Sequence, residues 1–353
     1  MFFDLFAIEN EKTENESENV QKLLKGIRLS GLWYIAFQAE EEPESAHNEF
    51  QLKRGYVTVQ KEFNKHLSVR VTQDIAVDHE GDGEGDIEIR LEYGFLQYRL
   101  NDFSIFTAPS FEFGLVHRPW LDFEEKINSY RLQGTMFLER NDIIKSADFG
   151  FTFTTLIGGE MSKKHDIDSP GRYGSISFGI YNGGGYEDLE RNNNKLIEGR
   201  LSLRPFPDKI PGLQLSYLGA YGKGNTNVSP DLSYNAGMLS WEQRAIAFSA
   251  LYYTGTGNRS GNAINDSGES ISQNGYSVFA EIAVAKTPLK AIGRFDNFDT
   301  ELSQSWHKRS YIFGVAYYFM PKSLILVDYD HTETNGNPVK KANIFEVVLQ
   351  FSY

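Results

Sequence analysis

Alternation of apolar and polar residues, one by one, is the feature that most constrains the fold of this chain. In DIEIRLEYGF one face carries Ile87, Ile89, Leu91, Tyr93 and Phe95, and the other carries Glu88, Arg90, Glu92 and Gly94. The same period runs through IRLSGLWYIAF, HLSVRVTQDIAV, SADFGFTFTT, GRYGSISFGIYNG, KLIEGRLSLRPF, GLQLSYLGAYG, RSYIFGVAYYF and NIFEVVLQFSY. A period of two indicates strands with one face in apolar surroundings and one in polar surroundings. We count roughly sixteen such segments of about ten to thirteen residues, a length that suits tilted membrane strands.

Composition excludes a helical membrane protein but leaves two β classes open. Hydrophobic residues make up 40% of the chain and the mean hydropathy is -0.42. The apolar runs are far shorter than the ~20 residues of a spanning helix. Aromatic residues reach 14%, with 32 glycines and no cysteine, which suits a barrel wall between lipid and water. A soluble β-sandwich or propeller shares most of these features.

Connection lengths favour the membrane barrel. The short connections are FNKH (63–66), RLND (99–102), PFPDKIPG (205–212), WEQR (241–244), AKTP (285–288) and MPKS (320–323). They alternate with long ones such as HEGDGEGD and GGGYEDLERNNN, as expected when turns lie on one rim and loops on the other. One connection, 158–170, is long although its place in the order calls for a short turn. Either the strand boundaries differ there from those assumed, or the turn itself contains extra residues. We predict an all-β transmembrane antiparallel β-barrel of about 16 strands over residues 27–353.

The two ends of the chain carry further expectations. The last strand-like segment ends on Tyr353 with no polar tail, and it must pair with the first strand, because closure leaves no apolar edge. Residues 1–26 form a charged and polar lead-in segment. The first residues lack a basic stretch followed by an apolar one, so we expect a mature form that begins with an added methionine. The net charge of -13 argues against nucleic acid as a partner.

Several stretches resemble the phosphate-selective porin O/P family in order and spacing. They are FEFGLVHRPW, MFLERND, GRYGSISFGIYNGGGY, KLIEGRLSLRPFPD and PGLQLSYLGAYG, and they extend over nearly the whole chain after the lead-in. The resemblance implies a 16-stranded outer-membrane channel of a Gram-negative bacterium, usually a homotrimer, with the third outer loop folded into the lumen. The terminal aromatics Phe351 and Tyr353 look like the insertion signal that the outer-membrane assembly machinery reads.

Charged residues on the polar faces are the candidate pore lining. With the apolar faces toward lipid, the arginines that point inward are Arg28, Arg54, Arg70, Arg90, Arg200, Arg204 and Arg294. They can form a basic track that selects ions through its field. The acids that point inward are Asp74, Glu88, Glu92, Glu198, Asp296 and Glu346, so the alternative is that arginines and acids pair across strands and stiffen the wall.

The segment from His117 to Lys145 is too apolar and too long for a loose surface loop. We expect it to bury Trp120, Leu121, Phe123, Ile127, Tyr130, Met136, Phe137 and Leu138 against the wall. It would then present Arg118, Glu124, Glu125, Lys126, Arg131, Glu139 and Arg140 to a permeating solute, with Glu139 and Arg140 at the constriction. The alternative is a loop that makes trimer contacts or covers the barrel.

Catalysis and metal binding have little support in the sequence. No HExxH pair, cysteine or serine elbow is present, and the acidic loop at 79–86 lacks the full spacing of a calcium loop. We predict an outer-membrane porin that passes small hydrophilic solutes or ions, with anions such as phosphate as candidates. It would need no cofactor and would contact membrane lipid and lipopolysaccharide. The alternatives are a plugged structural or adhesin barrel and a barrel enzyme.

Overall fold

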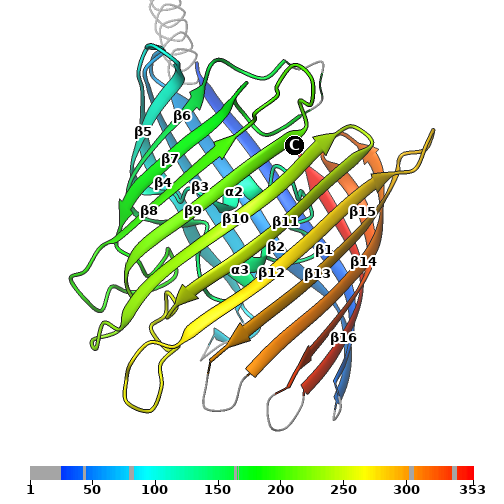
Figure 1. Ribbon diagram of the computed structural model, residues 1–353. Coiled ribbons are helices and arrows are strands. Elements are labelled where there is room, and N and C mark those ends of the chain that lie inside the picture. Colours follow the sequence, from blue (N-terminus) through cyan, green and yellow to red (C-terminus); the bar gives the residue numbers. More distant parts are fainter. Residues whose placement is uncertain are drawn as a thin grey trace, which may run out of the picture.

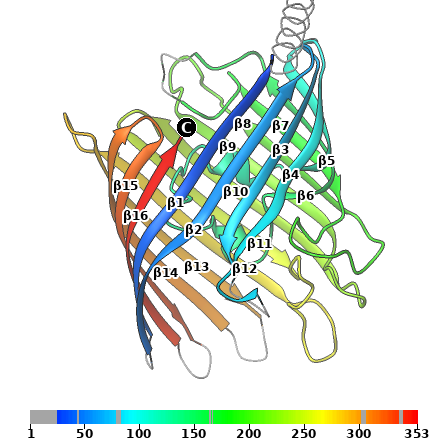
Figure 2. The same ribbon diagram turned by 180° about the vertical axis from the view of Figure 1, so that it is seen from behind.

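Strands β1 to β16 close into one antiparallel barrel in the computed structural model (Figures 1 and 2). The structure describes residues 25–42, 45–78, 83–162, 165, 167–301, 306–335 and 340–353. Most of the polar lead-in and residues 79–82 of the acidic loop therefore lie outside the described residues. Each strand pairs with its neighbours along the chain, and β1 pairs with β16. The predicted fold class is confirmed.

The strand boundaries follow the segments of alternating residues. The first eight strands are β1 (Ile27–Glu42), β2 (Ser45–Glu62), β3 (Leu67–Val77), β4 (Ile87–Arg99), β5 (Phe106–His117), β6 (Ala147–Ile157), β7 (Gly174–Tyr181) and β8 (Leu196–Leu203). The others are β9 (Leu213–Lys223), β10 (Asp231–Gln243), β11 (Ile246–Thr256), β12 (Ser272–Ala283), β13 (Leu289–Thr300), β14 (Trp306–Met320), β15 (Ser323–Thr334) and β16 (Lys340–Ser352). Two short helices, α2 (Leu121–Glu124) and α3 (Phe137–Arg140), lie between β5 and β6. Among the residues that the structure describes, no helix has the length and apolar character needed to cross a membrane.

The chain ends inside the sheet, as the terminal segment predicts. The β1–β16 register runs from Leu32 opposite Ser352 to Glu41 opposite Asn343. At the last residue, the backbone N–H of Tyr353 donates to the carbonyl of Gly31, and the N–H of Gly31 donates back, both at 3.1 Å. The final strand therefore closes the barrel and leaves no unpaired edge beside β1.

One connection on the short rim is long because it folds against the inner wall. β6 ends at Ile157 and β7 begins at Gly174. The turn itself therefore contains the extra residues, and the strand boundaries are close to those expected from the sequence. The backbone N–H of Ser169 donates to the Glu242 carboxylate of β10 at 3.3 Å, and the Arg204 guanidinium donates to the carbonyl of Gly171. These two hydrogen bonds hold the turn against β10 and against Arg204 at the end of β8.

Two β-bulges change which residues face the lumen. In the β1–β2 pair, Tyr34 lies opposite Arg54 and Ile35 lies opposite Leu52, which leaves Lys53 as the extra residue. In the β3–β4 pair, Thr72 lies opposite Tyr93 and Gln73 lies opposite Leu91, so the extra residue is Glu92. A bulge lets two consecutive side chains point to the same side. Lys53 and Arg54 thus both reach partners inside the barrel, and Glu92 and Tyr93 are both buried there.

The bulge in β4 overturns part of the predicted alternation. The sequence pattern places Tyr93 and Phe95 on the outer, apolar face with Leu91. In the structure both are buried inside the barrel, each with 7% of its surface exposed, whereas Leu96 and Tyr98 are exposed. The prediction for these two residues was wrong, because one extra residue shifts every later side chain to the opposite face.

Candidate functional site

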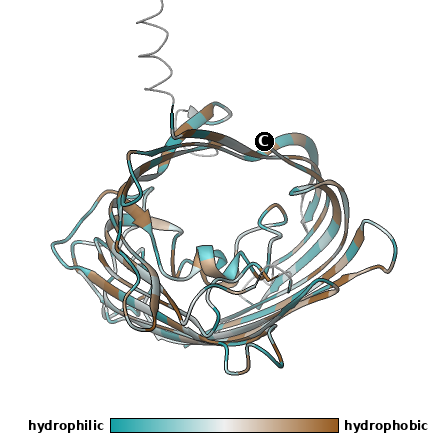
Figure 3. Ribbon diagram, turned by 90° about the horizontal axis from the view of Figure 1, so that it is seen from above, coloured by the Kyte–Doolittle hydropathy of each residue, from teal (hydrophilic) through white to brown (hydrophobic). Residues whose placement is uncertain are grey.

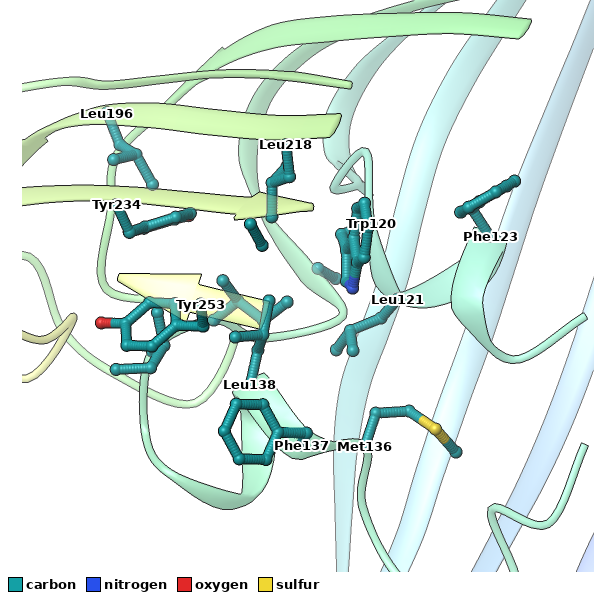
Figure 4. Packing of buried hydrophobic residues seen from close by; sticks show 14 of the residues in the cluster. Trp120, Leu121, Phe123, Met136, Phe137, Leu138, Leu196, Leu218, Tyr234 and Tyr253 are labelled. Atoms are coloured by element: carbon teal, nitrogen blue, oxygen red, sulfur yellow. The ribbon is translucent and has the colours of Figure 1, made fainter. Parts of the chain in front are cut away.

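The connection between β5 and β6, residues 118–146 and here called loop 3, lies inside the ring of strands (Figure 3). Its buried apolar side chains are Trp120, Leu121, Phe123, Ile127, Tyr130, Leu132, Met136, Phe137, Leu138, Ile143 and Ile144. Most of them form one cluster with Leu196, Leu218, Tyr234 and Tyr253 of β8 to β11 (Figure 4). Tyr130 and Leu132 join a second cluster with Phe279, Ile292 and Leu326. The predicted folding of this loop into the lumen is confirmed.

Ion pairs and hydrogen bonds hold the two ends of loop 3. Arg118, directly after β5, pairs with Glu198 of β8, and neither side chain is exposed. The guanidinium also donates to the Tyr234 hydroxyl at 2.6 Å. At the other end, the Ser146 hydroxyl donates to the Glu92 carboxylate at 2.7 Å. Glu92, the extra residue of the bulge in β4, thus accepts the hydrogen bond that holds this end of the loop.

The middle of loop 3 is bonded to the opposite side of the barrel. Lys53 Nζ of β2 donates to the Gln133 carbonyl at 3.1 Å and to Glu346 of β16 at 2.6 Å. Arg140 pairs with Asp330 of β15. Three further bonds extend this attachment: Arg294 to the Thr135 carbonyl at 2.9 Å, Tyr130 to Glu281 at 2.5 Å, and Gln133 to Asp330 at 3.3 Å. The loop therefore crosses the lumen and is attached on both sides.

A second connection also contacts the barrel wall and loop 3. Residues 182–195, here called loop 4, join β7 to β8. Tyr186 accepts a hydrogen bond from Arg54 at 2.7 Å, and Glu187 lies 3.3 Å from Arg90 and 2.7 Å from Lys145 of loop 3. Although burial opposes it, the charge of Lys145 lowers the pKa of Glu187 to about 2. Loop 4 therefore links β2 and β4 to loop 3.

A cavity of about 820 Å³ remains between loop 3 and the wall. Strands β1 to β4 and β13 to β16 contribute most of its lining. Loop 3 contributes a further part, and His117, Asp168, Lys322 and Tyr353 complete it. A smaller cavity of about 260 Å³ lies beside β3 to β8 and loop 3. His117 and Arg70 reach both cavities. Arg70 donates to Thr72 at 3.0 Å, lies 3.1 Å from His117 Nε2 and lies over the Tyr93 ring.

The predicted pore-lining residues occupy three kinds of position. Those that line a cavity are Arg70, Arg118, Arg131 and Arg200. Those that bind loop 4 are Arg54 and Arg90. Those that lie between loop 3 and its surroundings are Glu124, Glu139, Arg140 and Arg294. Acids accompany most of the arginines, for example Asp74 beside Arg54, Glu139 beside Arg131 and Asp296 beside Arg294.

Glu124 shows how fully the loop is packed. Its carboxylate accepts a hydrogen bond from Trp120 Nε1 at 2.7 Å, and the residue is 4% exposed. Burial raises the pKa of this carboxyl group to about 7, although Arg294 and the Trp120 bond act in the opposite direction. The side chain therefore lies against the wall, and its protonation is linked to the docking of the loop.

Four residues that bind loop 3 or belong to loop 4 escaped the sequence pattern. Lys53 reaches the lumen only because of a bulge, and Asp330, Tyr186 and Glu187 matter only through contacts across the barrel. The spacing along the chain carries no signal for such contacts. Within the described part of the chain, no group of three or more His, Cys, Asp or Glu residues is arranged to hold a metal ion.

Comparison with known proteins shows the fold and no closer relationship. No family model matches the chain, and no curated protein matches it. Three solved structures align over nearly the whole barrel. They are the trimer form of in-vitro folded OmpT, an outer membrane protein of Vibrio cholerae (12% identity, 93% of this chain and 100% of that chain, TM-score 0.62); an anion-selective porin from Comamonas acidovorans (11%, 93% and 99%, 0.65); and Salmonella typhi OmpF in complex with daunomycin (12%, 92% and 97%, 0.63). The chain therefore has the fold of the 16-stranded porins.

Proposed function

We propose that this protein is an outer-membrane diffusion channel for small hydrophilic solutes. The observation that carries the proposal is the 820 Å³ cavity between an inserted loop and the inner wall of a closed barrel. Exposed apolar side chains such as Ile27, Leu29 and Phe113 cover the outer face, which suits lipid. Passive flow through such a lumen needs neither a cofactor nor a catalytic group.

The same proposal includes the location and the assembly of the protein. Barrels of this fold include outer-membrane proteins, and one similar structure is a trimer form of OmpT from Vibrio cholerae. We therefore place the chain in the outer membrane of a Gram-negative bacterium, as a homotrimer in contact with lipid and lipopolysaccharide. Phe351 and Tyr353 would form the signal for the assembly machinery.

Ion selectivity should be weak. The similar porin from Comamonas acidovorans is anion-selective, and phosphate selectivity is what the family resemblance implies. In this lumen, however, Arg131 is paired with Glu139, Arg54 with Asp74 and Arg118 with Glu198. Paired charges largely cancel at a distance, so they attract free ions of either sign only weakly. We propose a channel whose reversal potential in a salt gradient stays near zero.

The test is single-channel recording of the purified protein in a planar bilayer under a potassium chloride gradient. Stepwise conductance with a small reversal potential supports the proposal. Strong anion selectivity with block by inorganic phosphate would contradict the weak field and favour the phosphate-selective alternative. Absence of current from inserted protein would overturn the channel function and point to a plugged structural barrel.

A further inference from the structure

The strand wall of the main cavity carries a row of uncharged side chains, and one end of this row contacts loop 3, because the Tyr318 hydroxyl donates to the Tyr130 hydroxyl at 3.2 Å. Tyr34 of β1 lies opposite Gln350 of β16, Gln350 lies opposite Leu324 of β15, and Leu324 lies opposite Tyr318 of β14. All four line the cavity. Tyr56 of β2 extends the row, because its ring meets the Tyr34 ring edge-on at 6.2 Å. Five neighbouring strands thus present a surface of aromatic rings, an amide and an aliphatic side chain.

Charge in the same cavity is balanced in number, and one base, Lys290, lies beside the row with its Nζ 5.1 Å from the centre of the Tyr318 ring. The acids are Glu92, Asp122, Glu125 and Asp168, and the bases are Arg70, Arg131, Lys290 and Lys322. Several of them already have partners: Asp122 bonds Lys126 at 2.5 Å, Lys290 bonds Glu281 at 2.7 Å, and Arg131 pairs with Glu139. A solute in this cavity therefore meets a row of mostly aromatic and uncharged side chains, together with charged groups that carry little net charge.

We propose that this cavity is a binding subsite for a neutral polyhydroxylated ring, the chemistry of a small saccharide. Such a ring has apolar C–H faces, which pack on tyrosine, and hydroxyl groups around its edge, which exchange hydrogen bonds with amides, hydroxyls and paired charges. A volume of about 820 Å³ lies within the range of ~300–1,000 Å³ that small-molecule sites occupy. The inference rests on the proposed channel function, in which the subsite would slow the passage of the solute that it binds.

The experiment separates binding from conduction and uses sucrose as the probe. Binding is measured by saturation-transfer NMR on the detergent-solubilised protein, which requires no current. Block is then measured as the fall in single-channel conductance with increasing sucrose, against polyethylene glycol of similar size as the control for excluded volume and viscosity. We expect saturable binding of sucrose and a saturable fall in conductance beyond that caused by the polymer.

Variants on one strand provide matched controls. Tyr318 faces the cavity, where its ring also lies near Lys290 Nζ, whereas its neighbour Tyr317 is exposed on the outer face. Tyr318→Leu should raise the half-saturating sucrose concentration about fivefold, the scale of one aromatic contact, and Tyr317→Leu should leave it unchanged. Tyr318→Phe keeps the ring and should keep most of the binding. If Tyr318→Leu fails to fold, Tyr56→Leu serves in its place.

The possible outcomes distinguish the two proposals. Current without saturable sucrose binding overturns the saccharide subsite and leaves the channel intact. Sucrose binding without any current supports the subsite and overturns the channel. Equal effects of Tyr318→Leu and Tyr317→Leu on sucrose binding also overturn the subsite, because the change would then not depend on the side chain in the cavity.

Discussion

Arg118 and Glu198 form an ion pair in which neither side chain is exposed to solvent. Arg118 is the first residue of loop 3, and Glu198 lies in β8, three strands away from the end of β5 around the barrel. The Tyr234 hydroxyl of β10 lies within hydrogen-bond distance of both charged groups. The pair therefore fixes the point at which the chain leaves the wall and turns into the lumen.

Removal of one partner of this pair should be strongly destabilising. Arg118→Met leaves the Glu198 carboxylate buried without its cation, a change that costs about 3–5 kcal/mol. The measurement is the free energy of unfolding in urea for the protein in lipid vesicles. The matched control is Lys126→Met, which breaks the more exposed pair with Asp122 in the same loop and should cost about 1 kcal/mol or less.

A double variant tests whether the loss comes from the unpaired charge. Arg118→Met combined with Glu198→Met removes both charges, so its unfolding free energy should lie above that of Arg118→Met alone. Equal stabilities of the single and the double variant would contradict this account, since the orphaned carboxylate would then contribute nothing.

Lys53 is expected to limit the movement of loop 3. Its ammonium group bonds both the Gln133 carbonyl and Glu346, so it ties the middle of the loop to the wall. Lys53→Met should release this part of the loop and give a larger and noisier single-channel conductance. Lys341→Met is the control, because Lys341 forms a looser pair with Glu333 at 3.7 Å near the outer rim. Unchanged current noise in Lys53→Met would show that the other attachments suffice.

Docking of loop 3 should weaken as the pH rises. The pKa of Glu124 is about 7 in the docked loop and close to its ordinary value of 4.5 when the loop is released. The docked state thus binds the proton more tightly, so its advantage is complete below pH 4.5 and is lost as the pH approaches 7. The full effect is at most about 3 kcal/mol.

Amide hydrogen exchange over residues 118–124, corrected for the intrinsic rate at each pH, measures this effect. Protection should be greater at pH 5 than at pH 8 in the natural chain. Glu124→Gln keeps an acceptor for Trp120 Nε1 and removes the titration, so the difference between the two pH values should shrink. The same pH dependence in Glu124→Gln would assign the effect to other groups.

The sequence predicts the barrel well because its information is local. Alternation of side chains and the lengths of connections belong to single segments, and they were sufficient to place the closing strand. The inserted loop was predicted from its length and apolar content and from the resemblance to a porin family. The lumen was harder to predict. Arg70 and Arg131 do line the cavity. Lys53 and Tyr93, however, point into the barrel because of bulges, and Tyr186 and Glu187 reach their partners through contacts across the barrel. A bulge is a property of two paired strands, so the alternation in one strand does not reveal it.

Cysteine labelling can test the bulge in β4, since the chain has no cysteine of its own. Leu91→Cys and Leu96→Cys should react with a membrane-soluble maleimide, because both residues are exposed on the outer face. Phe95→Cys should not react, because Phe95 is buried inside. Simple alternation from Leu91 predicts the opposite results for positions 95 and 96. Reaction at Phe95→Cys without reaction at Leu96→Cys would therefore show that β4 contains no bulge.

The aromatic residues at the end of β16 should affect the assembly of the barrel more than its final stability. The Phe351 ring stacks on Trp33 at 6.3 Å, and the final ladder bonds of Tyr353 to Gly31 use only the backbone. Phe351→Ala therefore keeps the closing ladder. If Phe351 and Tyr353 form the insertion signal, Phe351→Ala should reduce the rate at which heat-resistant barrels appear in outer membranes several-fold. Phe313→Ala removes a ring that is 60% exposed on the outer face of β14, and it should have little effect on that rate. Equal rates for the two variants would show that the end of the chain carries no special signal.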